Sequence, residues 1–88
     1  MRLANKTAII TGGGSGIGQA CAWAFYQEGA NVVLFGRREH KLKETAQELG
    51  SRAMTVSGDM TRSEDLDRLV QETLNKFHRI DILVNNAG

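Results

Sequence analysis

The sequence predicts an α/β fold in which one parallel β-sheet carries helices on both faces. Short apolar runs, typical of parallel strands buried on both sides, alternate with helical patterns along the 88 residues. A glycine-rich stretch, Thr11–Gly18, joins the first apolar run to the first helical pattern, and the stretch 85–88 follows the last run. Because strand and helix alternate without a break, right-handed crossovers should build a single doubly wound sheet.

Composition and charge indicate one small domain, residues 1–88, shorter than the usual doubly wound unit and therefore expected to be partial. The net charge is +1, and no basic tract or acidic tail points to a nucleic-acid or membrane partner. One cysteine cannot form an internal disulfide, and the first six residues lack the apolar core of a signal peptide. No apolar run approaches the roughly 20 residues that cross a bilayer. We expect a soluble, cytoplasmic protein.

The first strand is expected at Thr7–Thr11, a continuous apolar run. A helix should follow the glycines and end near Gly29. Its apolar stripe, expected to pack on the sheet, consists of Ile17, Ala20, Cys21, Ala24 and Phe25. Tyr26 falls opposite this stripe and Trp23 on its flank, so either ring could be exposed.

A β-branched and aromatic run predicts the second strand at Asn31–Phe35. A weaker amphipathic helix ends at Gly50, and its apolar positions are Leu42, Ala46 and Leu49. Residues Ala53–Val56 are the expected third strand.

The last helix is predicted to begin with a capping box, Thr61–Glu64, of the type S/T-x-x-E. Its apolar positions are Leu66, Leu69, Val70, Leu74 and Phe77. The fourth strand, Ile80–Val84, then runs directly into Asn85–Gly88.

The expected strand order is 3-2-1-4. In such sheets ligands bind beyond the carboxyl ends of the strands, where the order reverses between strands one and four. The glycine stretch ends strand one, and Asn85–Gly88 ends strand four. Both should therefore reach the same crevice.

The glycine stretch has the chemistry of a phosphate site. Glycines let backbone N–H groups approach a ligand, and the start of the following helix favours negative charge. The alternative is a plain flexible turn. The pattern G-x-G-x-x-G does not fit, and Gln19 stands where a P-loop needs lysine. The pattern T-G-x-x-x-G-x-G does fit, through Thr11, Gly12, Gly16 and Gly18.

Together with N-N-A-G at 85–88, this spacing closely resembles the short-chain dehydrogenase/reductase family, whose N-terminal half is a Rossmann-type doubly wound sheet. The resemblance covers Lys6–Gly88 and includes the order of strands and helices. It implies a dinucleotide site in which the glycine stretch contacts the phosphates and adjoining ribose.

The resemblance also places Asp59 at the adenine amino group, with Met60 next to it, and Asn86 to Gly88 beside the adenosine ribose. Asn85 and Asn86 would help to fix the sheet. Asp59 could instead be a simple turn or cap residue. The predicted cofactor-binding residues are Gly12, Gly14, Ser15, Gly16, Ile17, Gly18, Arg37, Asp59, Met60, Asn86, Ala87 and Gly88.

The end of the second strand indicates NADP(H) rather than NAD(H). An acid there would accept hydrogen bonds from the free 2′-hydroxyl of NAD, but this chain has Gly36 followed by Arg37 and Arg38. The planar guanidinium of Arg37 suits a phosphate. The two arginines could instead form a solvated helix start. Ser15 stands where many NADP-preferring relatives have a basic residue, and its hydroxyl can donate one hydrogen bond to phosphate.

The predicted catalytic set within this chain is empty. In the family, hydride transfer between a carbonyl and an alcohol uses a Tyr-x-x-x-Lys pair and a serine downstream of N-N-A-G. Tyr26 cannot substitute, because Ala30 stands four residues later. No metal site is expected either, since His40 and His78 are isolated.

Two hypotheses follow. The first is the cofactor-binding part of an NADP(H)-dependent oxidoreductase that acts on a small carbonyl or alcohol substrate and forms a homo-oligomer when full length. The second is a free-standing, noncatalytic dinucleotide-binding or interaction module. Intact-protein mass spectrometry separates them: a mass well above that of 88 residues favours the first, and a stable 88-residue product that binds cofactor without turnover favours the second.

Overall fold

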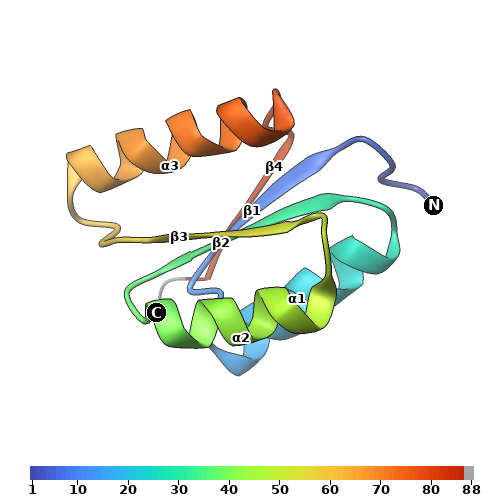
Figure 1. The fold of residues 1–88 in the computed structure, drawn as a ribbon, viewed down its shortest axis with the longest axis horizontal. Helices are drawn as coiled ribbons and strands as arrows, with labels where there is room; N and C mark the ends of the chain where they lie inside the picture. Colours follow the sequence, from blue (N-terminus) through green and yellow to red (C-terminus); the bar gives the residue numbers. More distant parts are fainter. Residues whose placement is uncertain (87–88) are drawn as a thin grey trace.

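The computed structural model describes residues 1–86, in which strands and helices alternate along the chain (Figure 1). The strands are β1 (Thr7–Thr11), β2 (Asn31–Gly36), β3 (Ala53–Ser57) and β4 (Ile82–Asn85). The helices are α1 (Gly16–Gln27), α2 (Glu39–Leu49) and α3 (Ser63–Phe77). The sequence-based prediction of all seven elements is confirmed, and the bounds of β1 are those expected from its apolar run.

The four strands form one parallel sheet in the order β3-β2-β1-β4. Ile9 of β1 pairs with Val33 on one side and with Leu83 on the other. Helices α1 and α2 cover one face of the sheet and α3 covers the other (Figure 1). The predicted fold class and strand order are therefore confirmed.

The central strands explain the continuous apolar runs in the sequence, because they are buried on both faces. On the side of α1 and α2, the core consists of Ile10, Ala22, Val32, Leu34, Leu42 and Leu49. On the side of α3, it consists of Ile9, Val33, Phe35, Val56 and Leu69. Complete burial of a side chain such as Phe35 stabilises the fold by about 1.5–3 kcal/mol.

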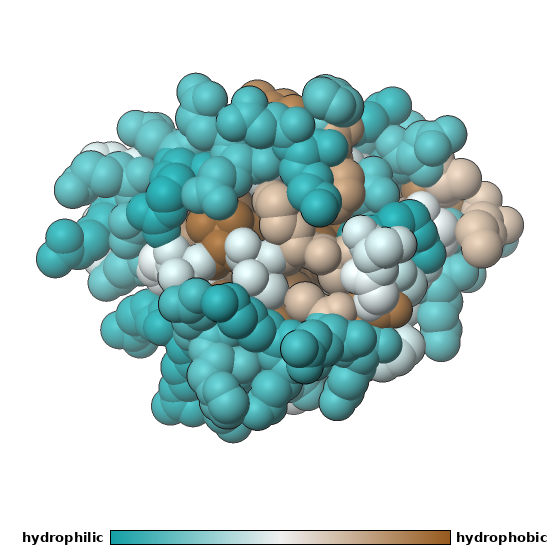
Figure 2. All heavy atoms as spheres, viewed as in Figure 1, coloured by the Kyte–Doolittle hydropathy of each residue, from teal (hydrophilic) through white to brown (hydrophobic). Residues whose placement is uncertain are grey.

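The face of the molecule drawn in Figure 2 is polar over two of the helices. Figure 2 shows hydrophilic side chains gathered over α3 and α2, with a paler, less polar band over the edge strand β3 between them. None of the helices in residues 1–86 combines the length and the apolar character that a membrane span requires.

Helix α1 packs by a different face from the one predicted. Its fully buried positions are Gly18 and Ala22, whereas Ile17 is 70% exposed. The start of the helix lies so close to the glycine loop that a Cβ on Gly18 would lie 2.3 Å from the Gly12 carbonyl oxygen and 3.0 Å from Cα of Gly13. The predicted stripe is therefore wrong for Ile17, Ala20 and Ala24, which are exposed, and right for Cys21 and Phe25, which are partly buried against the core.

Tyr26, expected opposite the packing stripe of α1, packs against the core of the α1 and α2 side instead. The guanidinium carbon of Arg52 lies 3.9 Å from the centroid of its ring, and the Arg52 side chain also donates hydrogen bonds to the carbonyls of Ala30 and Tyr26. A cation over an aromatic face is attracted to the ring. This contact joins α1 to the start of β3 at the amino ends of the strands.

The predicted capping box of α3 is not formed. The helix begins at Ser63, and the residue before it, Arg62, makes no side-chain cap. Thr61 lies one residue too early, and its hydroxyl donates to Oδ1 of Asp59 (2.7 Å). The side chain that would have capped α3 instead closes the turn before it.

Strand β4 begins two residues later than expected, and Asp81, directly before it, belongs to a side-chain cluster at the strand's start. Its Oδ2 accepts hydrogen bonds from the Thr7 backbone N–H (2.9 Å) and from Nε of Arg79 (2.8 Å). The Arg79 guanidinium, and then the Thr7 N–H, lower the pKa of Asp81 to about 2. The ionised carboxylate thus ties the start of β4 to the start of β1.

This cluster predicts a loss of stability in acid. The folded state holds the pKa of Asp81 at about 2, below its usual value of 3.8, so the stabilisation is complete above pH 4 and lost as the pH falls through 2. Asp81→Asn should therefore be less stable than the wild type at pH 7, with the difference shrinking between pH 4 and pH 2. Urea unfolding across this range measures it, and an equal difference at pH 2 and pH 7 would contradict the assignment.

Candidate functional site

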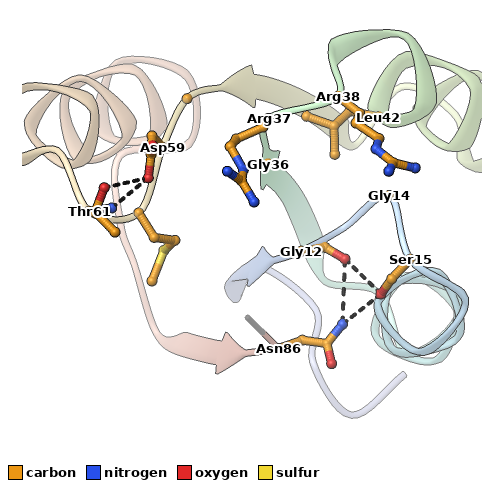
Figure 3. A pocket seen from close by; sticks show the side chains of 12 residues that line it. Gly12, Gly14, Ser15, Gly36, Arg37, Arg38, Leu42, Asp59, Thr61 and Asn86 are labelled. Carbon is orange, nitrogen blue, oxygen red and sulfur yellow. Dashed lines mark hydrogen bonds between the residues drawn. The ribbon is translucent and has the colours of Figure 1, made fainter. Parts of the chain in front are cut away.

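A cleft of about 1000 Å³ lies at the carboxyl ends of the strands (Figure 3). The loops that follow all four strands contribute to it. Its walls are formed by Gly12, Gly14, Ser15, Gly36, Arg37, Arg38, Leu42, Gly58, Asp59, Met60, Thr61 and Asn86. This is the place at which the strand order reverses, so the predicted crevice is present.

Hydrogen bonds join the end of β1 to the end of β4 on the floor of the cleft. The buried Thr11 hydroxyl accepts a hydrogen bond from the Asn86 backbone N–H (2.9 Å). It lies within donor distance of the Val84 carbonyl (3.2 Å) and of Oδ1 of Asn85 (3.3 Å). Thr11 therefore fixes the position of the segment that leaves β4.

Asn86 also holds the glycine loop itself. Its Nδ2 donates to Oγ of Ser15 (2.8 Å) and, more weakly, to the Gly12 carbonyl (3.4 Å), which forms the triangle seen in Figure 3. The Ser15 hydroxyl in turn donates to the Gly12 carbonyl (2.9 Å). The sequence suggested that Asn86 helps to fix the sheet, but gave no sign of this contact between its side chain and the loop.

Ser15 is the N-cap of α1, because its Oγ accepts a hydrogen bond from the Gly18 N–H (3.1 Å). The hydroxyl proton points to the Gly12 carbonyl, and Asn86 occupies the remaining acceptor position. The free hydroxyl donor expected for a phosphate is therefore engaged within the chain. Capping explains why a serine stands at this position.

The start of α1, next to the cleft, has backbone donors without partners. Within residues 1–86, the N–H groups of Gly14, Gly16 and Ile17 make no hydrogen bond. The first N–H groups of any helix lack partners inside the helix and carry partial positive charge. Three such groups in one short loop form a cradle suited to an anion.

Glycine is required by the fold at several positions of the loop, among them Gly12 and Gly18. Gly12 has φ +67°, and a Cβ there would lie 2.6 Å from the Asn86 carbonyl oxygen. A Cβ on Gly18 would lie 2.3 Å from the Gly12 carbonyl oxygen. At Gly16, by contrast, a Cβ would meet nothing within 4 Å. The fold gives no reason for glycine at Gly16, whereas a ligand seated on the N–H cradle would.

Arg37 extends from the end of β2 into the space between Asp59 and the glycine loop (Figure 3). Within the described residues its guanidinium makes no hydrogen bond, so all its donors are available to a ligand. Arg38 also lines the cleft and lies toward Gly14 (Figure 3). The arrangement places positive charge beside the N–H cradle.

Asp59 lies on the opposite wall and closes a tight turn. Its Oδ1 accepts hydrogen bonds from the backbone N–H (2.9 Å) and the hydroxyl (2.7 Å) of Thr61. These bonds, and then the charges of Arg37 and Arg62, lower the pKa of Asp59. The group is ionised at neutral pH and accepts hydrogen bonds only, and within residues 1–86 its Oδ2 has no donor. The turn interpretation is correct, and it leaves one oxygen for a ligand.

The cleft brings together most of the predicted site residues. Those that line it are Gly12, Gly14, Ser15, Arg37, Asp59, Met60 and Asn86. Gly16 and Ile17 are exposed at the start of α1 and do not line it, and Gly18 is buried beneath the loop. Ala87 and Gly88 lie outside the described residues. The lining residues that were not predicted to bind a ligand are Gly36, Arg38, Leu42, Gly58 and Thr61.

Comparison with known proteins gives consistent matches. The family model for short chain dehydrogenases matches residues 6–88. An uncharacterised oxidoreductase of Staphylococcus epidermidis is 42% identical over 87 residues, which are 99% of this chain and 38% of that protein. The chain thus spans less than half the length of this curated relative.

Solved structures agree with the sequence matches. A 3-ketoacyl-(acyl-carrier-protein) reductase from Brucella melitensis complexed with NADH superimposes with a TM-score of 0.95 and 43% identity, over 98% of this chain and 35% of the reductase. A glucose dehydrogenase of Caenorhabditis elegans in the apo form gives a TM-score of 0.94 and 44% identity, over 100% of this chain and 40% of the dehydrogenase.

The glycine contacts predict different effects for two similar substitutions. Gly18→Ala should lower stability by about 1–3 kcal/mol, because its Cβ overlaps the Gly12 carbonyl and the helix must shift. Gly16→Ala should keep or raise stability, since its Cβ enters open space and alanine favours a helix by up to about 1 kcal/mol. Thermal unfolding of both variants provides the comparison. Equal melting temperatures would contradict the contact at Gly18.

Proposed function

Because this chain belongs to the short-chain dehydrogenase family, we propose that residues 1–88 are part of one domain that binds a nicotinamide dinucleotide, with NADP(H) preferred over NAD(H). The observation that carries the proposal is the anion cradle at the start of α1, which faces Arg37 across a cleft large enough for a dinucleotide. The residues present fit such a group: the N–H donors lack partners within residues 1–86, and the space that a Cβ would fill at Gly16 is open.

The N–H groups of Gly14, Gly16 and Ile17 would hold the diphosphate. The helix dipole favours the negative charge at this point. Gly18 contributes indirectly, because its absent Cβ lets α1 approach Gly12. Asn86 and Ser15 hold the loop in this shape before any ligand arrives, so little ordering would be needed on binding.

Arg37 would contact the 2′-phosphate that distinguishes NADP(H). A guanidinium can make two parallel hydrogen bonds to a phosphate, and Arg37 has no hydrogen bond within residues 1–86 to give up. The neighbouring Gly36 supplies no carboxylate to accept hydrogen bonds from the free 2′-hydroxyl of NAD. NAD(H) is the second candidate, supported by the Brucella reductase, which was solved with NADH.

The ionised carboxylate of Asp59 would accept a hydrogen bond from the adenine amino group. Its Oδ1 is held by Thr61, so the second oxygen is presented at a fixed angle. Met60 and Asn86 would lie along the adenosine, as would Ala87 and Gly88 outside the described residues.

We propose that the whole protein is an oxidoreductase of the short-chain dehydrogenase type that interconverts a small carbonyl compound and its alcohol. The bound cofactor would supply or accept the hydride. These 88 residues hold the cofactor and contain no Tyr-x-x-x-Lys pair. Relatives named as a reductase and a glucose dehydrogenase support this class of reaction. Assembly as a homo-oligomer in the cytoplasm is part of the same proposal.

Removal of the Arg37 side chain tests the cofactor preference. Arg37→Ala should weaken NADP(H) binding by roughly 1.5–3 kcal/mol, the value of a charged hydrogen bond, and should change NAD(H) binding far less. Titration calorimetry with both cofactors measures the difference. Lys43→Ala is the matched control, because it removes the same charge from an exposed pair with Glu39 that does not line the cleft. Equal weakening of both cofactors by Arg37→Ala would refute the assignment.

Introducing an acidic residue at the neighbouring Gly36 should shift the cofactor preference from NADP(H) toward NAD(H). A Cβ on Gly36 would lie 3.5 Å from Cδ2 of Leu42, which is an ordinary van der Waals contact, so the backbone there accepts a residue with a Cβ. Gly36→Asp should weaken NADP(H) on the order of 100-fold, because its carboxylate repels the 2′-phosphate, and should strengthen NAD(H). Gly36→Ala, which adds bulk without charge, separates repulsion from crowding. If both variants lose NADP(H) equally, charge is not the cause.

A further inference from the structure

The first turn of α3 is hydrogen-bonded to the backbone of the loop that carries Asp59. Oδ2 of Asp65 accepts a hydrogen bond from the Asp59 backbone N–H (2.8 Å), and Oδ1 of Asp65 accepts one from Nη1 of Arg68 (3.0 Å). Nη2 of Arg68 donates to the carbonyl of Ser57. One carboxylate and one guanidinium therefore hold the loop on both sides of Gly58.

The same segment has little room to move. A Cβ on Gly58 would lie 2.9 Å from Cε1 of Phe35 and 3.0 Å from Cβ of Asp65. The backbone thus runs between the buried ring of β2 and the first turn of α3. The side chain of Asp65 is only 19% exposed, so it works as a packed support rather than as a solvated surface charge.

We propose that Asp65 is a positioning residue for adenine recognition, acting through the Asp59 backbone to aim the free carboxylate oxygen of Asp59 at the base. The inference rests on the proposed dinucleotide site and adds a residue that lies outside the cleft lining. Without the Asp65 carboxylate, the Asp59 N–H loses its acceptor and Arg68 loses one anchor. The turn at Asp59 and Thr61 stays intact, but its orientation toward the cleft is no longer fixed.

Asp65 also has a second role, in the stability of α3. Acidic residues in the first turn of a helix stabilise it through the helix dipole, and both Glu64 and Asp65 lie there in α3. Glu64 is exposed and forms no hydrogen bond or ion pair within residues 1–86. Glu64→Ala therefore removes the same charge from the same turn and leaves the loop untouched, which makes it the matched control.

The test compares NADP⁺ with its hypoxanthine analogue, in which a carbonyl oxygen replaces the amino group of adenine. The purified wild type should prefer NADP⁺ by about tenfold or more, since the analogue sets an acceptor against the Asp59 carboxylate. Asp65→Ala should lose most of this preference, as should Asp59→Ala, and the double variant should lose no more than Asp59→Ala alone. Glu64→Ala should keep the wild-type preference.

Asp65→Asn distinguishes the loss of this hydrogen bond from a folding defect. Its amide oxygen can still accept from the Asp59 N–H, so most of the preference should return, and thermal unfolding shows that each variant is folded. An unchanged preference in Asp65→Ala, or an equal loss for both nucleotides, overturns the inference while leaving the proposed function in place. A wild type that binds neither nucleotide overturns the proposed function itself.

Discussion

The close approach of the Gly12 backbone to both α1 and the end of β4 is the constraint on which the site depends. A Cβ at Gly12 would lie 2.6 Å from the Asn86 carbonyl oxygen, and one at Gly18 would lie 2.3 Å from the Gly12 carbonyl oxygen. Because neither Cβ exists, the N-terminus of α1 sits directly against the ends of the two strands. Only this proximity allows Ser15 and Asn86 to share hydrogen bonds across the loop.

Most of the fold could be predicted from the sequence, because strands that are buried on both faces have easily recognised, continuous apolar sequences. Continuous apolar runs such as Thr7–Thr11 gave the strands and, through the crossover rule, their order. The face of α1 could not be predicted in this way. The hydrophobic pattern predicted that Ile17 packs against the core, but the buried residues of α1 are Gly18 and Ala22. At Gly18 the close approach of the glycine loop leaves no room for a Cβ. Where two backbones approach this closely, the size of a side chain, and not its hydrophobicity, determines which residue fits.

The candidate site was predicted in part. Motif spacing identified the loop, and seven of the twelve predicted residues line the cleft. The sequence did not show which partner each hydroxyl group would choose. Thr61 closes the turn at Asp59 instead of capping α3, and the Ser15 hydroxyl donates its hydrogen bond to the Gly12 carbonyl of the loop. The hydrogen bond from the Asp59 backbone N–H to Asp65 could not be predicted either, since no sequence pattern distinguishes Asp65 from the other acidic residue in the first turn of α3. Such contacts depend on distances between loops that only the folded chain sets.

Amide chemical-shift mapping of the purified protein during titration with NADP⁺ tests whether the start of α1 is the phosphate cradle. Saturable shifts should be largest at the N–H groups of Gly14, Gly16 and Ile17. Little change is expected at Tyr26 and Arg52, which meet at the amino ends of the strands. Saturation with shifts centred on Tyr26 and Arg52, or no shift in the glycine loop, would contradict a phosphate site at the start of α1.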